Sequence, residues 1–350
     1  MTPDPPIRRV LVADTHVPFV SGGAERHVAS LVEELRRRGY EAETATVPFR
    51  PQSRETLLGQ AAAWRLLELD AADGRPVDLL IATRFPSYFA RHPRKVAWVI
   101  HQHRPAYELC GTPFSDFDWR EEDLAIRQRL LELDRQMLGE CRRVFANARN
   151  TAHRLERFNG VAATPLYHPP PLATRLHEGR PGDYVLVVGR LERVKRPDLA
   201  VRAMAHVAAP TRLVLAGAGS EQAALMELAR ATGVGDRIAF AGAPDDARLV
   251  ELYAGAMAVL YAPFDEDYGY VTLEAFLSGK PVITASDSGG TLEFVTDGET
   301  GLVTAPEPEA VGAAISRLAG NAALAARLGA AGRARAALVT WDGVVEQLVG

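Results

Sequence analysis

The sequence predicts an α/β protein made of two doubly wound, Rossmann-like domains. At 350 residues the chain is too long for one small domain, and two domains are the usual expectation for this length. Short apolar runs alternate with helical patterns along the whole chain, as in parallel sheets covered by helices on both faces. The alternation is interrupted once, by a proline-rich stretch at 165–182. We therefore predict a first domain at 1–170 and a second at 171–339.

The first domain is predicted from one helix and four buried strands. The helical pattern at 24–38 ends at Gly39, since glycine commonly occupies the position just after a helix. The apolar runs that we interpret as strands are 9–14, 78–82, 96–100 and 143–147.

The second domain repeats the pattern after the stiff, turn-rich linker that contains His168-Pro-Pro-Pro. Five further strands are predicted at 184–189, 212–217, 238–242, 258–262 and 281–285, each followed by a helical pattern, of which 271–278 is one. The part beyond 306 is rich in alanine and arginine and is predicted to be helical. Ligands of doubly wound sheets bind at the carboxyl ends of the strands, so we expect the site in a cleft where the two domains face each other.

Composition excludes several classes of protein. The chain has 40 basic and 44 acidic residues, a net charge of −4, and neither half is strongly basic, so no nucleic-acid partner is expected. Two cysteines, Cys110 and Cys141, form neither a disulfide framework nor a metal spacing. The polar start and the absence of any apolar run near the ~20 residues of a membrane span predict a cytoplasmic protein.

Gly22 and Gly23 follow the first predicted strand, at the start of a helix. The absence of two side chains lets backbone N–H groups approach an anionic or sugar ligand. A turn that only reverses the chain is the alternative. The pair is not a G-x-G-x-x-G motif, which argues against a dinucleotide.

Arg190 and Lys195 follow the first strand of the second domain. Lys195 precedes Pro197, which favours the first position of a helix. Two cations at one strand end suit a diphosphate, with each contact contributing ~1.5–3 kcal/mol. A solvated loop is the alternative, but lysine is rare here, with three among the 40 basic residues, so its use at 195 favours a role.

Glu266 and Glu274 flank the predicted start of the helix 271–278. The backbone amides of Gly269, Tyr270 and Val271 would be donors without helical partners there. A carboxylate that accepts two neighbouring hydroxyls is a common way to hold a ribose. The alternative is that Glu274 only complements the helix dipole and that Glu266 is solvated.

His101 and His103 follow the strand 96–100, but further ligands at zinc spacing are missing. At a strand end His101 is placed to contact a sugar, although a packing or surface histidine remains the alternative. Two D-x-D triplets, 116–118 and 265–267, suggest a metal clamp on a nucleotide diphosphate, but neither has a third ligand nearby. No metal site is predicted.

Taken together, the motifs resemble the retaining glycosyltransferases of family 4, which have the GT-B fold. The matching elements, in order, are Ser21-Gly-Gly-Ala-Glu25, Val99-Ile-His101, Gly189-Arg190 with Lys195-Arg-Pro-Asp198, Glu266-x7-Glu274, and Ser278-Gly-Lys-Pro-Val-Ile283 before Ser288-Gly-Gly290. They cover nearly the whole chain.

The resemblance implies a hexosyltransferase of carbohydrate biosynthesis. It would move a hexose from a UDP- or GDP-linked sugar to an acceptor hydroxyl with retention, and with neither metal nor cofactor. The roles implied for the matching residues are diphosphate binding by Arg190 and Lys195, ribose binding by Glu274, contacts to the donor sugar by Glu266, His101 and the amides of Gly269, Tyr270 and Val271, and close approach of the ligands at Gly22 and Gly23. The segment 340–350 would pack back on the acceptor-side first domain.

The acceptor is left open between a sugar, a lipid-linked and a small-molecule hydroxyl. Arg36-Arg-Arg38 suggests peripheral contact with the inner face of a membrane, although cations also favour a solvated helix end. Three other functions remain open: a sugar-nucleotide 2-epimerase of the same fold, a non-catalytic sugar-nucleotide-binding protein, and a nicotinamide-dependent oxidoreductase using Gly217-x-Gly219. This last motif lacks a third glycine and an acidic residue after the next strand.

Overall fold

The computed structural model describes residues 6–20, 22–52 and 54–350, and the chain divides into two compact units. The first runs to His168 and also contains Thr340–Gly350, whereas the second is Pro169–Val339. The sequence placed this boundary at 170 and the return of the chain at about 340. Ser21, which belongs to the predicted glycine motif, lies outside the described residues.

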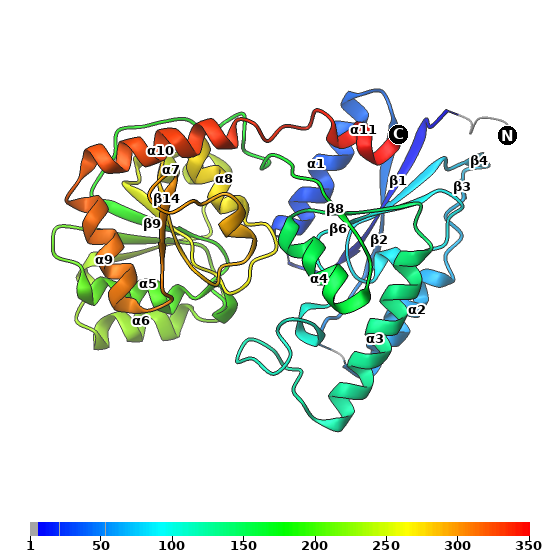
Figure 1. Ribbon diagram of the computed structural model, residues 1–350, viewed down its shortest axis with the longest axis horizontal. Helices are drawn as coiled ribbons and strands as arrows, with labels where there is room; N and C mark the ends of the chain where they lie inside the picture. The colour runs from blue at the N-terminus through cyan, green and yellow to red at the C-terminus, as the bar shows by residue number, and fades with distance from the viewer. Residues whose placement is uncertain (1–5, 21, 53) are drawn as a thin grey trace. The chain divides into compact units, whose positions relative to one another are not determined.

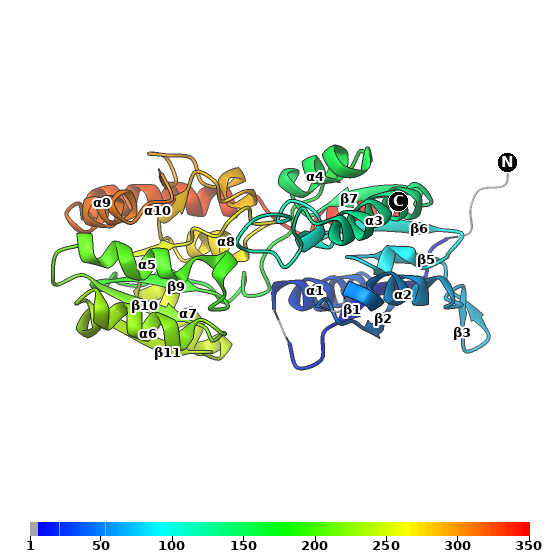
Figure 2. The ribbon, with the colours of Figure 1, turned by 90° about the horizontal axis from the view of Figure 1, so that it is seen from below.

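The first unit contains a six-stranded parallel sheet in the order β2-β1-β5-β6-β7-β8, of which Figure 2 shows β7, β6, β5, β1 and β2 one after another from top to bottom. All four predicted strands of this domain are confirmed. The strands are β1 (Arg9–His16), β2 (Glu41–Pro48), β5 (Leu79–Ala82), β6 (Lys95–Val99), β7 (Arg143–Ala146) and β8 (Thr164–Pro165), with a short antiparallel ribbon of β3 (Ala71–Ala72) and β4 (Arg75–Pro76).

Alternate residues of these strands face two different hydrophobic cores, as the two-residue period of a strand requires. Val12, Ile81 and Trp98 pack with helices α1 and α11. Leu80 and Val99 pack with α2, α3 and α4 on the other face, and Figure 1 shows the two groups of helices above and below the strands. The helices are α1 (Gly23–Arg37), α2 (Arg54–Arg65), α3 (Glu121–Gly139), α4 (Arg149–Asn159) and α11 (Val344–Val349), with single 3-10 turns at Ser87–Phe89 and Arg104–Ala106.

The second unit contains another six-stranded parallel sheet, in the order β11-β10-β9-β12-β13-β14. The order reverses beside β9, which makes the carboxyl ends of β9 and β12 the switch point of the sheet, where ligands of such folds bind. The strands are β9 (Tyr184–Val188), β10 (Arg212–Ala216), β11 (Ile238–Gly242), β12 (Ala258–Leu260), β13 (Val282–Ala285) and β14 (Gly301–Thr304), and only β14 was not predicted.

Helices follow four of the five predicted strands of the second unit, whereas β13 is followed only by a 3-10 turn and then by β14, so the helical pattern predicted after 281–285 is wrong. The helices enclose a core in which residues such as Val185, Leu215 and Ile283 meet apolar side chains of the helices. They are α5 (Pro197–Ala203), α6 (Gln222–Ala231), α7 (Asp246–Gly255), α8 (Tyr270–Leu277), α9 (Pro308–Ala319) and α10 (Ala322–Ala336), with 3-10 turns at Arg193–Lys195, Met204–His206, Gly235–Arg237 and Gly290–Glu293. None of the helices in the described part of the chain is both long and apolar enough to cross a membrane.

The returning C-terminal segment completes the first unit. Trp341 packs on Trp98 and on His168, with ring centroids 6.2 and 5.7 Å apart. The apolar residues of α11 join the same core as α1, and Arg143 donates to the carbonyl oxygens of Leu348 and Gly350, at 3.3 and 3.0 Å. One face of the first sheet is therefore covered by residues from both ends of the sequence.

Candidate functional site

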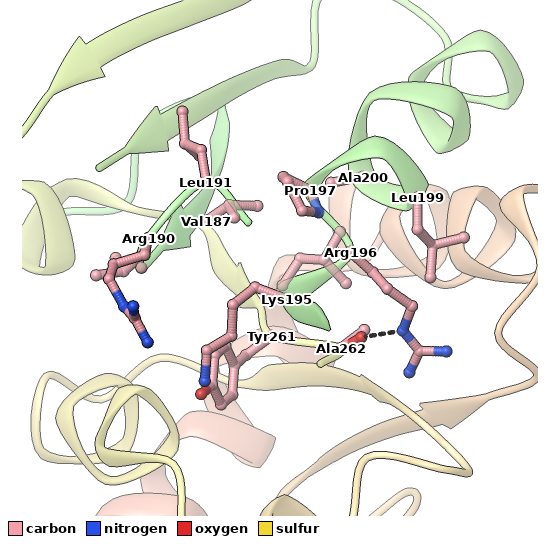
Figure 3. A pocket seen from close by; sticks show the side chains of 13 residues that line it. Val187, Arg190, Leu191, Lys195, Arg196, Pro197, Leu199, Ala200, Tyr261 and Ala262 are labelled. Atoms are coloured by element: carbon pink, nitrogen blue, oxygen red, sulfur yellow. Dashed lines mark hydrogen bonds between the residues drawn. The ribbon is translucent and has the colours of Figure 1, made fainter. Parts of the chain in front are cut away.

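A pocket opens at the carboxyl ends of β9 and β12 in the second unit (Figure 3). Its lining comes from the residues just after β9, from the turn that leads into α5, and from the end of β12. Arg190, Lys195 and Tyr261 are among these residues. The two cations singled out in the sequence therefore lie at the switch point of the sheet.

Lys195, which lines this pocket, forms an ion pair with Glu266. The side chains are 20% and 11% exposed, so both charges are partly withdrawn from water. The Lys195 ammonium also lies 5.9 Å from the centre of the Tyr261 ring. The structure thus joins two predicted site residues that are 71 positions apart.

Arg190 points to the same side of the pocket as Lys195 in Figure 3. Its guanidinium donates to Glu192 at 2.6 Å, and the side chain is 52% exposed. An exposed ion pair of this kind contributes at most about 1 kcal/mol, so exchanging Glu192 for an anionic ligand costs little. Arg190 is therefore accessible to an anion that reaches the strand ends.

Backbone packing explains Gly217 and Gly219 without a dinucleotide. A Cβ on Gly217, whose φ is +159°, would lie 1.8 Å from the carbonyl oxygen of Gly189. A Cβ on Gly219 would lie 2.4 Å from the carbonyl oxygen of Leu191. The two glycines let the segments after β9 and β10 touch backbone to backbone, which supports the segment that carries Arg190.

The segment with Glu266 is fixed by its own backbone. The Glu266 amide donates to the Ser288 carbonyl at 3.3 Å, and its carbonyl accepts from the Gly290 amide at 2.8 Å. Gly269 then begins α8 at a φ of +81°, where a Cβ would be 2.9 Å from Tyr261. Gly269, Tyr270 and Val271 are thus at the N-terminal end of α8, as predicted from the sequence.

Glu274 lies one turn further along α8 and is buried. One of its carboxylate oxygens accepts a hydrogen bond of 2.7 Å from the hydroxyl of Tyr253, which is fully buried at the end of α7. Tyr253 was not singled out in the sequence, because it occurs in an ordinary apolar helix pattern. Its hydroxyl fixes the direction of the Glu274 carboxylate.

The glycine turn of the first unit is anchored by an ion network that the sequence did not indicate. The Gly22 amide donates to Glu25 at 2.8 Å, and the other oxygen of Glu25 accepts from Arg84 at 2.7 Å. Arg84 is buried and also binds both oxygens of Asp14, at 2.8 and 3.0 Å. Gly23 is the first residue of α1, so this network holds the start of that helix.

Burial and Arg84 act in opposite directions on the two carboxyl groups. Burial raises the pKa of Asp14 above its ordinary value, although the Arg84 guanidinium and the Thr83 hydroxyl oppose it. Burial acts in the same direction on Glu25, but Arg84 and the backbone amides outweigh it and hold the pKa of Glu25 below its ordinary value.

His101 and His103 differ in their environments. His101 is half-buried after β6, with its Nδ1 2.8 Å from the carbonyl oxygen of Gln102. The Gln102 side chain donates to Asn159 at 2.7 Å, which fixes the segment that carries His101. His103 is buried against Phe85 and neighbouring aromatic rings, and burial lowers its pKa to about 3. His103 is thus a packing residue.

The acidic side chains of the triplet 116–118 have partners in the protein, and the triplet 265–267 is held through its backbone. Asp116 forms an ion pair with Arg54 at 3.5 Å, and Asp118 accepts from the Trp119 amide at 2.8 Å. The Asp265 amide donates to the Asp287 carbonyl oxygen at 2.9 Å. Within residues 6–20, 22–52 and 54–350, no three or more His, Cys, Asp or Glu side chains form a group that could hold a metal ion.

Two parallel doubly wound units, with cations and carboxylates at the switch point of the second, place the chain in the class of GT-B folds. Residues 176–335, which is less than half of the chain, match the family Glycosyl transferases group 1, so the second unit contains a domain of that type. Curated relatives include D-inositol 3-phosphate glycosyltransferases. The protein of Nocardia farcinica is 32% identical over 246 residues, covering 62% of this chain and 53% of the relative, and that of Acidothermus cellulolyticus is 37% identical over 182 residues, covering 48% and 40%.

The matched stretches thus span about half the length of these relatives. Solved structures agree on the fold over almost the whole chain. Sucrose-phosphate synthase from Thermosynechococcus elongatus has a TM-score of 0.75 at 23% identity, covering 97% of both chains. Anabaena Alr3699/HepE in complex with UDP and glucose has a TM-score of 0.72 at 20% identity, covering 97% of this chain and 98% of the other.

Proposed function

We propose that the protein is a retaining glycosyltransferase that moves a hexose from a UDP- or GDP-linked sugar to an acceptor hydroxyl. The observation that carries the proposal is the pair of cations, Arg190 and Lys195, at one switch-point pocket in a glycosyl transferases group 1 domain, with Lys195 paired to Glu266. Arg190 and Lys195 supply the positive charge, and Glu266 and Glu274 supply carboxylates that accept sugar hydroxyls. The presence of UDP and glucose with the similar Anabaena protein agrees with a nucleotide-sugar donor.

Arg190 and Lys195 are proposed to bind the donor diphosphate. In the structure Lys195 is paired with Glu266, so a diphosphate would have to compete with one carboxylate for this ammonium. Its larger negative charge, together with Arg190 and the start of α5, favours that exchange. Glu266 is then available to accept hydroxyls of the donor sugar, beside the amides that begin α8.

The chemical step is proposed to be a displacement on the face of the leaving group. The bond between the anomeric carbon and the diphosphate oxygen breaks, a bond to the acceptor oxygen forms on the same face, and the acceptor proton passes to the departing diphosphate. Charge develops on that diphosphate, so positive side chains fixed beside it stabilise the transition state more than the ground state. The two cations thus do the work that a metal does in other transferases, and no metal is required.

The first unit is proposed to hold the acceptor and to contribute His101 to the donor sugar. Gly22 and Gly23 carry no side chains of their own that would keep a ligand from the backbone, and the Arg84 network fixes the turn. The acceptor class stays open between sugar, lipid-linked and small-molecule hydroxyls, and contact with the inner face of a membrane is part of that question.

The test combines donor binding and turnover. The wild-type protein is titrated with UDP, GDP and NAD by calorimetry, and its slow hydrolysis of UDP- and GDP-sugars is followed with and without excess EDTA. We expect binding of one nucleoside diphosphate, release of free α-configured hexose, and full activity in EDTA. Lys195→Ala should weaken binding and turnover by ~10-fold or more, from the loss of a charge-assisted contact.

Arg193→Ala is the matched control, because Arg193 belongs to the same 3-10 turn and is exposed. It should leave binding and turnover unchanged. Binding of NAD alone would favour an oxidoreductase, binding without any turnover would favour a binding protein, and conversion of the nucleotide sugar to its 2-epimer would favour the epimerase. Inhibition by EDTA would restore the D-x-D interpretation.

A further inference from the structure

Arg196, directly after Lys195, has a backbone conformation that L residues rarely adopt. Its φ and ψ are +49° and +48°, in the left-handed region that glycine normally occupies. The residue separates the 3-10 turn of Lys195 from α5. Backbone strain of this kind persists only where surrounding contacts hold it, and it occurs most often at functional sites.

The contacts that hold Arg196 are four hydrogen bonds from its guanidinium. Two go to the two carboxylate oxygens of Asp287, at 2.9 and 2.6 Å. The other two go to the carbonyl oxygens of Ala262 and Pro263, at 2.8 and 2.9 Å. The side chain is 12% exposed. A guanidinium has five N–H donors, so four of the five are already used inside the protein.

Arg196 thereby joins three segments that follow neighbouring strands of the second sheet. It belongs to the segment after β9, its carbonyl partners follow β12, and Asp287 follows β13. Backbone hydrogen bonds join the same three segments. The Phe264 amide donates to the Val194 carbonyl at 2.8 Å, and the Asp265 amide donates to the Asp287 carbonyl at 2.9 Å. Lys195 and Glu266 are the next residues on two of these three segments.

We propose that Arg196 and Asp287 form a clamp that positions Lys195 and Glu266 for the diphosphate and the sugar of the donor. The inference rests on the proposed function and adds two positioning residues to it. Arg196 is not itself a diphosphate ligand, because four of its five donors are occupied and Figure 3 shows its guanidinium on the other side of Ala262 from Arg190 and Lys195. A bidentate arginine–carboxylate pair fixes direction as well as distance, which is what a site of two charges on separate loops needs.

Three variants separate a positioning role from a purely structural one. Arg196→Gly removes the guanidinium and keeps the backbone conformation unstrained. Arg196→Lys keeps the charge but loses the bidentate geometry. Asp287→Asn removes the carboxylate and keeps its size. Arg212→Gln is the control. Arg212, the first residue of β10, also donates two hydrogen bonds to one carboxylate, that of Asp183, at 3.2 and 2.6 Å.

The measurements are calorimetric binding of UDP and GDP, steady-state donor hydrolysis, and hydrogen exchange of the Phe264 and Asp265 amides, all well below the unfolding temperature. We expect Arg196→Gly and Asp287→Asn each to weaken nucleotide binding and to lower kcat by about tenfold or more, because misplacement by about 1 Å has effects of this size. The double variant should be no worse than either single one, Arg196→Lys should recover part of the loss, and both amides should exchange faster. Arg212→Gln should match the wild type.

Wild-type affinity and kcat in folded Arg196→Gly and Asp287→Asn, while Lys195→Ala loses binding, would overturn the clamp and leave the proposed function standing. Lower stability with unchanged binding would also overturn it, since that is the signature of a structural role. Failure of the wild type to bind either nucleotide would overturn the proposed function, and with it the ligand assigned here.

Discussion

Replacing Arg84 by methionine tests the ion network beneath the glycine turn. The guanidinium is 8% exposed and bonds to Asp14 and Glu25, whose side chains are 6% and 22% exposed. Methionine fills much of the volume but leaves two carboxylates without their cation. Removing one partner of a buried ion pair costs ~3–5 kcal/mol. For a unit of this size that corresponds to a fall of roughly 6–20 °C in the unfolding midpoint.

The loss should depend on pH. The pKa of Asp14 is raised even with Arg84 present, and without the cation it rises further. An acid with a raised pKa in the folded state destabilises that state when ionised, and the penalty disappears as pH falls through the folded-state value. Glu25 acts in the same sense, because its lowered pKa contributes stability in the wild type that is full above its unfolded value near 4.5 and is lost as pH falls from there through the lower folded-state value. The difference between variant and wild type should therefore shrink from pH 7 to pH 4.

Tryptophan fluorescence reports on unfolding of the first unit alone, because this unit contains all four tryptophans of the chain, Trp64, Trp98, Trp119 and Trp341. Thermal unfolding is followed at pH 7, 5 and 4. The control is Arg75→Met, which breaks an ion pair with Glu41 whose side chains are 57% and 56% exposed, so that solvent screens the interaction and the unfolding midpoint should barely change. An Arg84→Met loss no larger than this control, or equal at pH 7 and pH 4, would refute the reasoning.

Three other predictions concern single side chains. Tyr253→Phe removes the hydroxyl that holds Glu274, so donor affinity should fall by ~10-fold in calorimetry, while an unchanged affinity would show that Glu274 needs no such support. Gly269→Ala places a Cβ 2.9 Å from Tyr261 at a φ of +81°. It should lower the stability of the second unit by more than Gly298→Ala, where φ is +71°, the space is open and a loss of ~1–2 kcal/mol is expected. Equal losses would contradict the close contact. The pKa of His103 is about 3, so the folded state resists protonation of this ring and loses stability as pH falls below the unfolded value of 6.5. His103→Leu should therefore reduce the dependence of the unfolding free energy on pH, measured in urea between pH 6.5 and 4.5, by ~1.4 kcal/mol per pH unit. An unchanged pH dependence would contradict this.

The buried strands could be predicted from the sequence because a strand covered on both faces is apolar throughout. Residues 79–82 and 96–99 are of this kind, and both are strands in the structure. β2 was missed because it is an edge strand. Most of its side chains are exposed or half-buried, and Glu41, Glu43 and Thr44 interrupt any apolar run. An apolar run in the sequence thus detects a buried strand, whereas an exposed edge strand leaves no such run and is missed.

The sequence predicted the charged residues of the candidate site but not the residues that hold them in place. Lys195, Glu266 and Glu274 were found because charged side chains follow strands, but their partners were not. Arg196 and Tyr253 look ordinary in sequence, and their roles depend on contacts between segments that are far apart in the chain. The rarity of lysine was an ambiguous signal, since Lys95 is buried and donates to backbone carbonyl oxygens of Tyr88, Ala90 and Met137.

The return of residues 340–350 to the first unit has a consequence for synthesis. The face of the first sheet that includes Val12 and Trp98 is closed partly by α11, which the ribosome makes only after the whole second unit. Until then this apolar face is incompletely covered, so the first unit cannot finish folding before the second has emerged. The unit that starts first is completed last, and no single cut in the chain would release it intact.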